Sequence, residues 1–160
     1  TYPLTKRFFI APQIFLGFTF AISTLMAHTA VTNTYPSLII WILFFATIIW
    51  VTTFDTMYAM ADKADDIKIG INSTAILFGN KDRIIIAFLQ SVFYSIFVYI
   101  GYIKDYSYVF YFFLFIAFIL GVYNQLLIKN SKPKFCIMAF KNNQYIGFLI
   151  FMGIYGEYIL

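Results

Sequence analysis

Five long apolar runs, separated by short polar stretches, constrain the fold of this 160-residue chain more than any other feature. A helix needs about 20 mostly apolar residues to cross the hydrocarbon core of a membrane. The expected helices cover about residues 8–30, 37–54, 84–103, 106–128 and 145–160, and the second continues toward residue 66. We therefore expect an all-α, multi-pass transmembrane helical bundle of about five helices that forms one domain over residues 1–160.

The composition agrees with a membrane location and excludes other classes. The chain is 62% hydrophobic and only 11% charged, whereas soluble domains carry about 25% charged residues. The net charge of +4 is spread over short loops rather than gathered in one stripe, so we expect the lipid bilayer, and not nucleic acid, as the partner. The single cysteine, Cys136, excludes an internal disulfide and a cysteine-based metal cluster.

The basic residues indicate how the chain lies in the membrane. Ten of the eleven Lys and Arg residues fall in alternate loops on one side, and only Lys104 falls on the other. Loops rich in Lys and Arg stay on the cytoplasmic face. The region after residue 54 therefore faces the cytoplasm if the chain lies in a bacterial inner membrane, or the matrix if it lies in the mitochondrial inner membrane.

An acidic stretch follows the second apolar run. Four of the seven acidic residues fall within residues 55–66. If the helix continues through them, positions 55, 58, 62, 65 and 66 share an arc of roughly 100°. Crowded carboxylates repel one another, and Asp62 and Asp66, one turn apart, are suited to hold Mg2+ between them. Gly70 is expected to end this helix, and Ser73 and Thr74 to cap the next element.

A simpler interpretation is a solvated acidic loop whose carboxylates pair with Lys63 and Lys68 and set the topology. The chain would then be a non-enzymatic membrane protein, or a transporter fragment with a cation-binding loop. A third class, the CDP-alcohol phosphotransferases, also places Asp-x-x-x-Asp at a cytoplasmic helix end. Its motif needs Asp-Gly and Ala-Arg upstream, and this chain has Asp55-Thr56 instead.

The spacing of the acidic stretch resembles a known motif. It is similar to the second aspartate-rich motif of the UbiA-type intramembrane prenyltransferases, and most similar to that of the 4-hydroxybenzoate polyprenyltransferases of ubiquinone biosynthesis. The matching pattern is Asp55-x-x-Tyr58-Ala-x-x-Asp62-x-x-Asp65-Asp66-x-x-x-Gly70-x-x-Ser73-Thr74-Ala75. Near the N-terminus, Tyr2-x-x-x-Lys6 followed by Pro12-Gln13 resembles a second motif of the same family.

The resemblance implies both a fold and a missing part. Family members have nine transmembrane helices and a first aspartate motif, Asn-Asp-x-x-x-Asp-like, which does not occur in this sequence. The five helices expected here resemble helices five to nine, the C-terminal portion. We expect a separate N-terminal half to carry the first motif; alternatively, the chain is a split or degenerate product that does not act alone.

The resemblance also implies an activity and assigns roles to residues. The expected reaction is the Mg2+-dependent transfer of a polyprenyl group from polyprenyl diphosphate to an aromatic acid, 4-hydroxybenzoate. Catalysis would depend on the two metal-binding carboxylates and one lysine, namely Asp62, Asp66 and Lys6. Two further carboxylates, Asp55 and Asp65, would support the metal. The diphosphate side would be contacted by Tyr2, Lys6 and Lys68.

Overall fold

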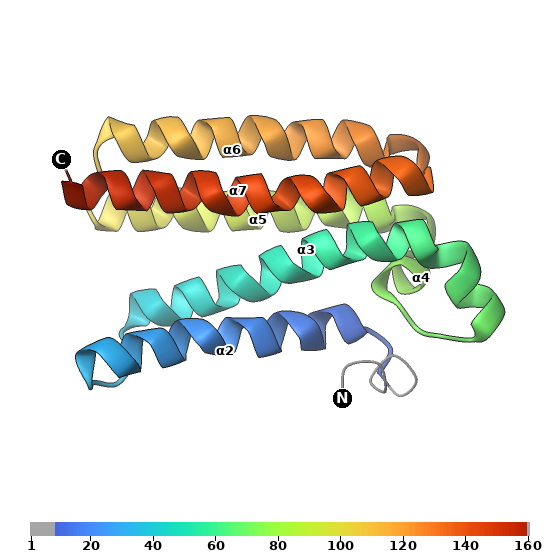
Figure 1. The fold of residues 1–160 in the computed structure, drawn as a ribbon, viewed down its shortest axis with the longest axis horizontal. Helices are drawn as coiled ribbons and strands as arrows, with labels where there is room; N and C mark the ends of the chain where they lie inside the picture. Colours follow the sequence, from blue (N-terminus) through green and yellow to red (C-terminus); the bar gives the residue numbers. More distant parts are fainter. Residues whose placement is uncertain (1–8, 160) are drawn as a thin grey trace.

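A computed structural model of the chain describes residues 9–159, and the regular structure within that range is entirely helical (Figure 1). The all-α prediction is therefore confirmed. The elements in chain order are α2 (Pro12–Thr32), α3 (Leu38–Ile69), α4 (Thr74–Phe78), η1 (Gly79–Lys81), α5 (Asp82–Ile103), α6 (Tyr108–Leu127), η2 (Ile128–Asn130) and α7 (Pro133–Ile159), where η1 and η2 are single turns of 3-10 helix.

Helices α2 and α3 form an antiparallel hairpin along one side of the bundle (Figure 1). Helix α2 begins at Pro12, where the proline ring presets the helical φ and its missing N–H removes no helical hydrogen bond. Gly17 allows the two helices to approach closely, because a Cβ at that position would lie 2.8 Å from the carbonyl oxygen of Ile48. The hairpin is therefore tightly packed near the start of α2.

Helix α6 packs against α5 and α7, and α3 packs against the same two helices (Figure 1). Their shared core is rich in aromatic rings, which bury large apolar areas. The Tyr94 hydroxyl, buried between α5 and α6, donates a 2.8 Å hydrogen bond to the carbonyl oxygen of Ala117. The core cluster consists of Ala46, Phe93, Tyr94, Phe97, Phe110, Leu114, Ala117, Ile146 and Ile150.

Within the described residues, four helical segments are long and apolar enough to cross a membrane: Pro12–Thr32, Leu38–Ile69, Thr74–Ile103 and Tyr108–Asn130. Helix α7 was also expected to cross, over residues 145–160. It is not among these four, because the polar residues Lys141–Gln144 interrupt its apolar sequence. It nevertheless packs along α6 for most of its length (Figure 1).

The basic segment before residue 145, which was expected to be a loop, is largely helical. Helix α7 begins at Pro133 rather than at residue 145, because the intervening residues are amphipathic: Cys136 and Ala139 are fully buried, whereas Lys134 and Lys141 are exposed. The expected basic loop between α6 and α7 is thus reduced to a tight turn. The segment between Gly70 and residue 84 contains the short helix α4 and the turn η1.

The polar segments gather at one end of the bundle. The start of α2, the end of α3, helix α4 and the starts of α5 and α7 lie together there, and the turn between α5 and α6, which carries Lys104, lies at the other end (Figure 1). This arrangement agrees with the alternation of the basic loops along the sequence. The face of the membrane that each end occupies stays a prediction.

Candidate functional site

The acidic stretch lies on the last turns of α3, which runs without a break from Leu38 to Ile69. No Gly or Pro interrupts these 32 residues, so nothing in the sequence ends the helix where the apolar run gives way to carboxylates. The helix ends at Gly70, whose φ of +72° is the left-handed conformation that glycine adopts without steric cost. The predicted helix end at Gly70 is confirmed.

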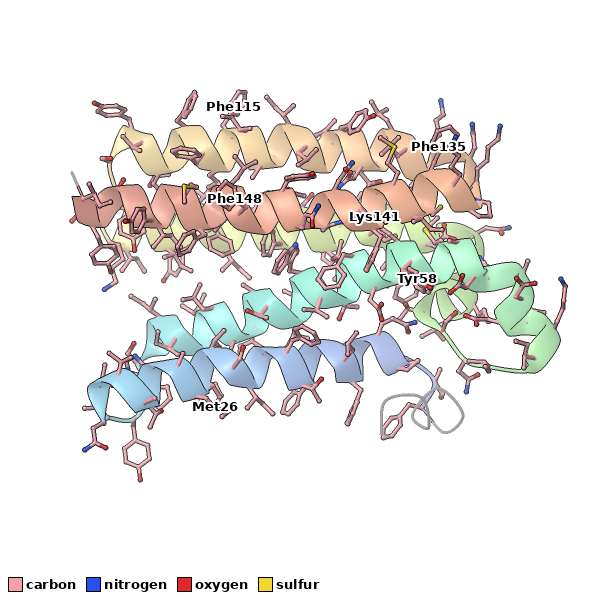
Figure 2. The ribbon with its side chains drawn as sticks, in the orientation of Figure 1. Met26, Tyr58, Phe115, Phe135, Lys141 and Phe148 are labelled. Carbon is pink, nitrogen blue, oxygen red and sulfur yellow. The ribbon has the colours of Figure 1, made fainter. Side chains whose placement is uncertain are left out.

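Three of the acidic side chains surround Tyr58. The Tyr58 hydroxyl forms a hydrogen bond with the Asp62 carboxylate and lies close enough to Asp55 and Asp66 to interact with their charges. On the other side, the ring of Tyr58 packs against Phe140 of α7, with the ring centroids 5.2 Å apart. Figure 2 shows Tyr58 on α3, facing the side of the bundle that α7 covers. Asp62 is therefore in direct contact with Tyr58, and Asp55 and Asp66 are near enough for their charges to act on the same hydroxyl.

The carboxylates differ in how far they are exposed. Asp66 is buried, with only 7% of its surface exposed, and Asp55 and Asp62 are half-buried. Asp65 is exposed and forms a 2.9 Å ion pair with Lys68, which is also exposed. Asp65 and Lys68 thus point away from the group around Tyr58. Their predicted roles, as metal support and diphosphate contact, stay predictions.

The donor set fits a hard divalent cation. Asp62 and Asp66 offer carboxylate oxygens one helical turn apart, and Mg2+ is usually bound by one or two carboxylates while water and substrate phosphate complete its shell. Among residues 9–159, no group of three or more His, Cys, Asp and Glu side chains is arranged to enclose a metal. Asp62 and Asp66 are therefore the carboxylates of this helix end that could hold such a cation, and the identity of the metal stays a prediction. The other predicted contacts, Tyr2 and Lys6, lie outside the described residues.

A buried hydrogen-bond chain links the turn after α3 to α2 and to α3 itself. Gln13, which is 1% exposed, accepts a 2.9 Å hydrogen bond from the backbone N–H of Thr74. The Thr74 and Thr56 hydroxyls share a second hydrogen bond of 2.7 Å. Ser73 caps α4, since its hydroxyl accepts from the N–H of Ile76 at 3.3 Å. The predicted capping by Ser73 is confirmed, whereas the Gln13 contact, which joins residues 61 positions apart, was not predicted.

Lys63 has a different partner from the one considered for it. Its ammonium group donates to the Gly79 carbonyl oxygen at 2.7 Å and to the Asp82 carboxylate at 3.3 Å. It therefore connects the acidic end of α3 to the first residue of α5. In the solvated-loop interpretation, Lys63 and Lys68 would both pair with carboxylates of the acidic stretch. Lys68 does so, through Asp65, whereas Lys63 pairs with Asp82, which lies outside the stretch.

An apolar cavity lies beside the acidic face, between α3 and α7. Its volume is about 280 Å³, and it is lined by Trp50, Phe54, Phe140, Lys141, Asn143 and Gln144. Phe140 lies between this cavity and Tyr58. Among the described residues, the buried indole N–H of Trp50 has no hydrogen-bond partner. The cavity could not be predicted from the sequence, because its lining depends on how α3 and α7 pack.

Comparison with known proteins agrees with this geometry. The chain matches the UbiA prenyltransferase family over residues 1–149. It is 45% identical over 157 residues to a 4-hydroxybenzoate octaprenyltransferase of Coxiella burnetii, an alignment that covers 98% of this chain and 54% of the relative. A 4-hydroxybenzoate octaprenyltransferase of Psychromonas ingrahamii is 42% identical over 158 residues, with 99% of this chain and 55% of the relative covered. The chain thus spans about half the length of the curated relatives it matches.

Two solved structures share the fold. The apo structure of a UbiA homologue from Aeropyrum pernix K1 has a TM-score of 0.77 at 22% identity and covers 96% of this chain and 58% of that one. A structure from work on digeranylgeranylglyceryl phosphate synthase in membranes has a TM-score of 0.78 at 19% identity and covers 93% of this chain and 53% of that one. The family predicted from the aspartate motif is confirmed: this multi-pass membrane chain belongs to the UbiA prenyltransferase family.

Proposed function

We propose that the chain takes part in the transfer of a polyprenyl group from polyprenyl diphosphate to an aromatic acid, 4-hydroxybenzoate, as a step of ubiquinone biosynthesis. Its similarity to 4-hydroxybenzoate octaprenyltransferases, which are 42–45% identical over nearly all of its length, supports this activity. One structural observation carries the proposal: Asp62, hydrogen-bonded to Tyr58, and the buried Asp66 lie one turn apart at the end of an apolar helix. A carboxylate group in that position suits a metal that binds a diphosphate.

In this proposal, Asp62 and Asp66 would hold Mg2+, with Asp55 and, more weakly, the outward-facing Asp65 in support. When bound, the ion neutralises the negative charge that develops on the diphosphate as the allylic C–O bond breaks. The hydrogen bond from Tyr58 orients Asp62, and burial within the helix end fixes Asp66. Lys6 and Tyr2, which lie outside the described residues, would contact the diphosphate, Lys6 through its charge.

Departure of the diphosphate leaves an allylic cation, which the electron-rich ring of 4-hydroxybenzoate attacks ortho to its hydroxyl. The ring carbon then loses its proton to the released diphosphate, so that one C–O and one C–H bond break and one C–C and one O–H bond form. The cavity lined by Trp50, Phe54 and Phe140 adjoins the acidic face and would shield such a cation from water. The face of Trp50, Phe54 or Phe140 would also attract a cation placed over it.

The proposal includes a membrane location and a partner. The basic loops place the acidic end of the bundle on the cytoplasmic face of a bacterial inner membrane, or on the matrix face in mitochondria. In this proposal, an N-terminal half supplies the first aspartate motif, which does not occur in these 160 residues.

The test is to supply the two halves together. Membranes that contain this chain receive octaprenyl diphosphate, isotopically labelled 4-hydroxybenzoate and Mg2+, with and without the first four helices of the Coxiella burnetii relative on a second polypeptide. We expect prenylated product only when both halves are present, and none with Asp62→Ala or Asp66→Ala. Product formation that is unaffected by both substitutions would contradict the proposal. Cation uptake without any product would favour the transporter interpretation.

A further inference from the structure

The contact between Lys63 and the start of α5 joins the predicted metal ligands to the body of the bundle. The Lys63 ammonium lies 2.7 Å from the Gly79 carbonyl oxygen and 3.3 Å from Asp82 Oδ2. The side chain of Asp82 is only 8% exposed and that of Lys63 is 27% exposed. A buried carboxylate is stable only when it is paired, so Lys63 and Asp82 hold each other in place.

The position of Lys63 on α3 explains what this contact can control. Met57, Ala59 and Met60 are buried against α4, α5 and α7, and Lys63 continues the same face three and four residues further on. Asp62 lies one residue earlier in the chain and therefore about 100° around the helix axis. Fixing the direction of Lys63 consequently fixes the direction in which Asp62 projects.

The end of α3 needs such a restraint. Asp55, Asp62 and Asp66 all lie near Tyr58, and in the absence of a cation their like charges favour a wider separation. The last turns of α3 extend past the bundle core toward α4 (Figure 1). A contact on the face beside the carboxylates opposes rotation of these turns without occupying a metal-binding oxygen.

We propose that Lys63, held by Asp82 and the Gly79 carbonyl, is a positioning residue that sets the orientation of Asp62 and Asp66 for the divalent cation. This inference rests on the proposed function, because it takes those two carboxylates as the ligands. Lys63 does not touch the metal; it acts through the direction of its neighbours on α3.

The sign of one effect separates positioning from electrostatics. Lys63 carries a positive charge near a cation site, so its charge alone weakens cation binding, and removing the charge would strengthen binding. Positioning predicts the opposite for Lys63→Met. Lys68→Met is the matched control, because it removes the same charge from the same helix end but breaks only an exposed pair with Asp65.

The experiment measures Mn2+ binding to the purified full chain in detergent micelles by electron paramagnetic resonance, with Mn2+ replacing Mg2+. We expect Lys63→Met to weaken Mn2+ affinity by about tenfold, which is within the range found when residues that orient metal ligands are removed. Lys63→Arg should stay within about twofold of the unsubstituted chain, since a guanidinium can donate to both oxygens. Lys68→Met should leave the affinity unchanged or slightly higher.

Two further variants keep the outcome decisive. Lys63→Met/Asp82→Asn removes both charges, so no unpaired buried carboxylate destabilises the fold, and it should weaken binding as Lys63→Met does. Asp62→Asn tests the metal assignment itself. If Asp62→Asn abolishes binding while Lys63→Met and the double variant do not weaken it, the positioning role is overturned and the proposed function stands. If Asp62→Asn leaves Mn2+ binding unchanged, the metal assignment fails, and the inference with it.

Discussion

The side-chain carbonyl of Gln13 accepts a 2.9 Å hydrogen bond from the backbone N–H of Thr74, which joins the first turn of α2 to the turn that follows the acidic stretch. Both residues are buried, at 1% and 0% exposure. Water therefore does not replace the bond if it is lost. The contact fixes the start of α4 beside the end of α3 and so helps to hold the acidic stretch in place.

Gln13→Leu should destabilise the chain, because it leaves the buried Thr74 N–H without its acceptor. An unsatisfied buried polar group of this kind costs about 1–3 kcal/mol in the free energy of unfolding. Denaturant unfolding in detergent micelles, followed by circular dichroism, measures the change. Gln144→Leu, at an exposed glutamine of α7, is the control and should shift the free energy by less than about 0.5 kcal/mol. Equal shifts for the two variants would show that the Gln13 contact contributes nothing specific.

Glu157 caps α6 from the end of α7 and should make stability depend on pH. Its carboxylate accepts hydrogen bonds from the Ser107 N–H at 2.8 Å, the Ser107 hydroxyl at 2.6 Å and the Phe110 N–H at 3.3 Å. The hydrogen bonds from Ser107 lower the pKa of Glu157, against an opposing contribution from burial.

The direction of the pH effect follows from the lowered pKa. The stabilising contribution of Glu157 is fully present above the unfolded-state pKa, about 4.3, and is lost as the pH falls through the lower folded-state pKa. Glu157→Gln should therefore be less stable than the unsubstituted chain at pH 7, and the difference should shrink as the pH falls below 4. Unfolding midpoints from pH 7 to pH 3 measure this, with Asp105→Asn in the neighbouring exposed turn as the control. A difference independent of pH would contradict the capping role of the charge.

Cys136 should be unreactive while the chain is folded. It is fully buried, and burial, with a smaller contribution from the Asp82 charge, raises the pKa of its thiol from 9.0 to about 11. A rise of this size lowers the thiolate population at neutral pH about a hundredfold. Maleimide labelling should accordingly be much slower than at a cysteine introduced by Lys132→Cys in the exposed turn before α7, and the two rates should become similar in denaturant. Rapid labelling of the native Cys136 would show that the start of α7 opens readily.

The helices and the family followed from local features of the sequence, whereas the supporting contacts did not. The continuity of α3 could be predicted because no Gly or Pro occurs between Leu38 and Ile69. The early start of α7 was missed because its first turns carry Lys134 and Lys141 on an exposed face, so they resemble a basic loop.

The pairing of Lys63 with Asp82 could not be anticipated from spacing either. The two residues are 19 positions apart, and they are brought together by α4 and η1, whose geometry does not follow from spacing along the sequence. Similarly, spacing placed Asp65 on the same arc as Asp62, but its ion pair with Lys68 directs it outward. Hydrophobic periodicity predicts which face of a helix is buried, but it does not predict which polar partner a side chain meets there.

The most direct test of the central claim compares Asp62→Asn with Asp65→Asn in the two-half prenyl-transfer assay. Both variants remove one negative charge from the same helix, but only Asp62 lies against Tyr58, whereas Asp65 is exposed and paired with Lys68. We expect Asp62→Asn to lower the rate of product formation by about a hundredfold or more, because mutating even a residue that only hydrogen-bonds to a metal ligand lowers activity about 10–100-fold. Asp65→Asn should lower the rate only a few-fold. Equal rates for the two variants, or full activity of Asp62→Asn at saturating Mg2+, would contradict this expectation.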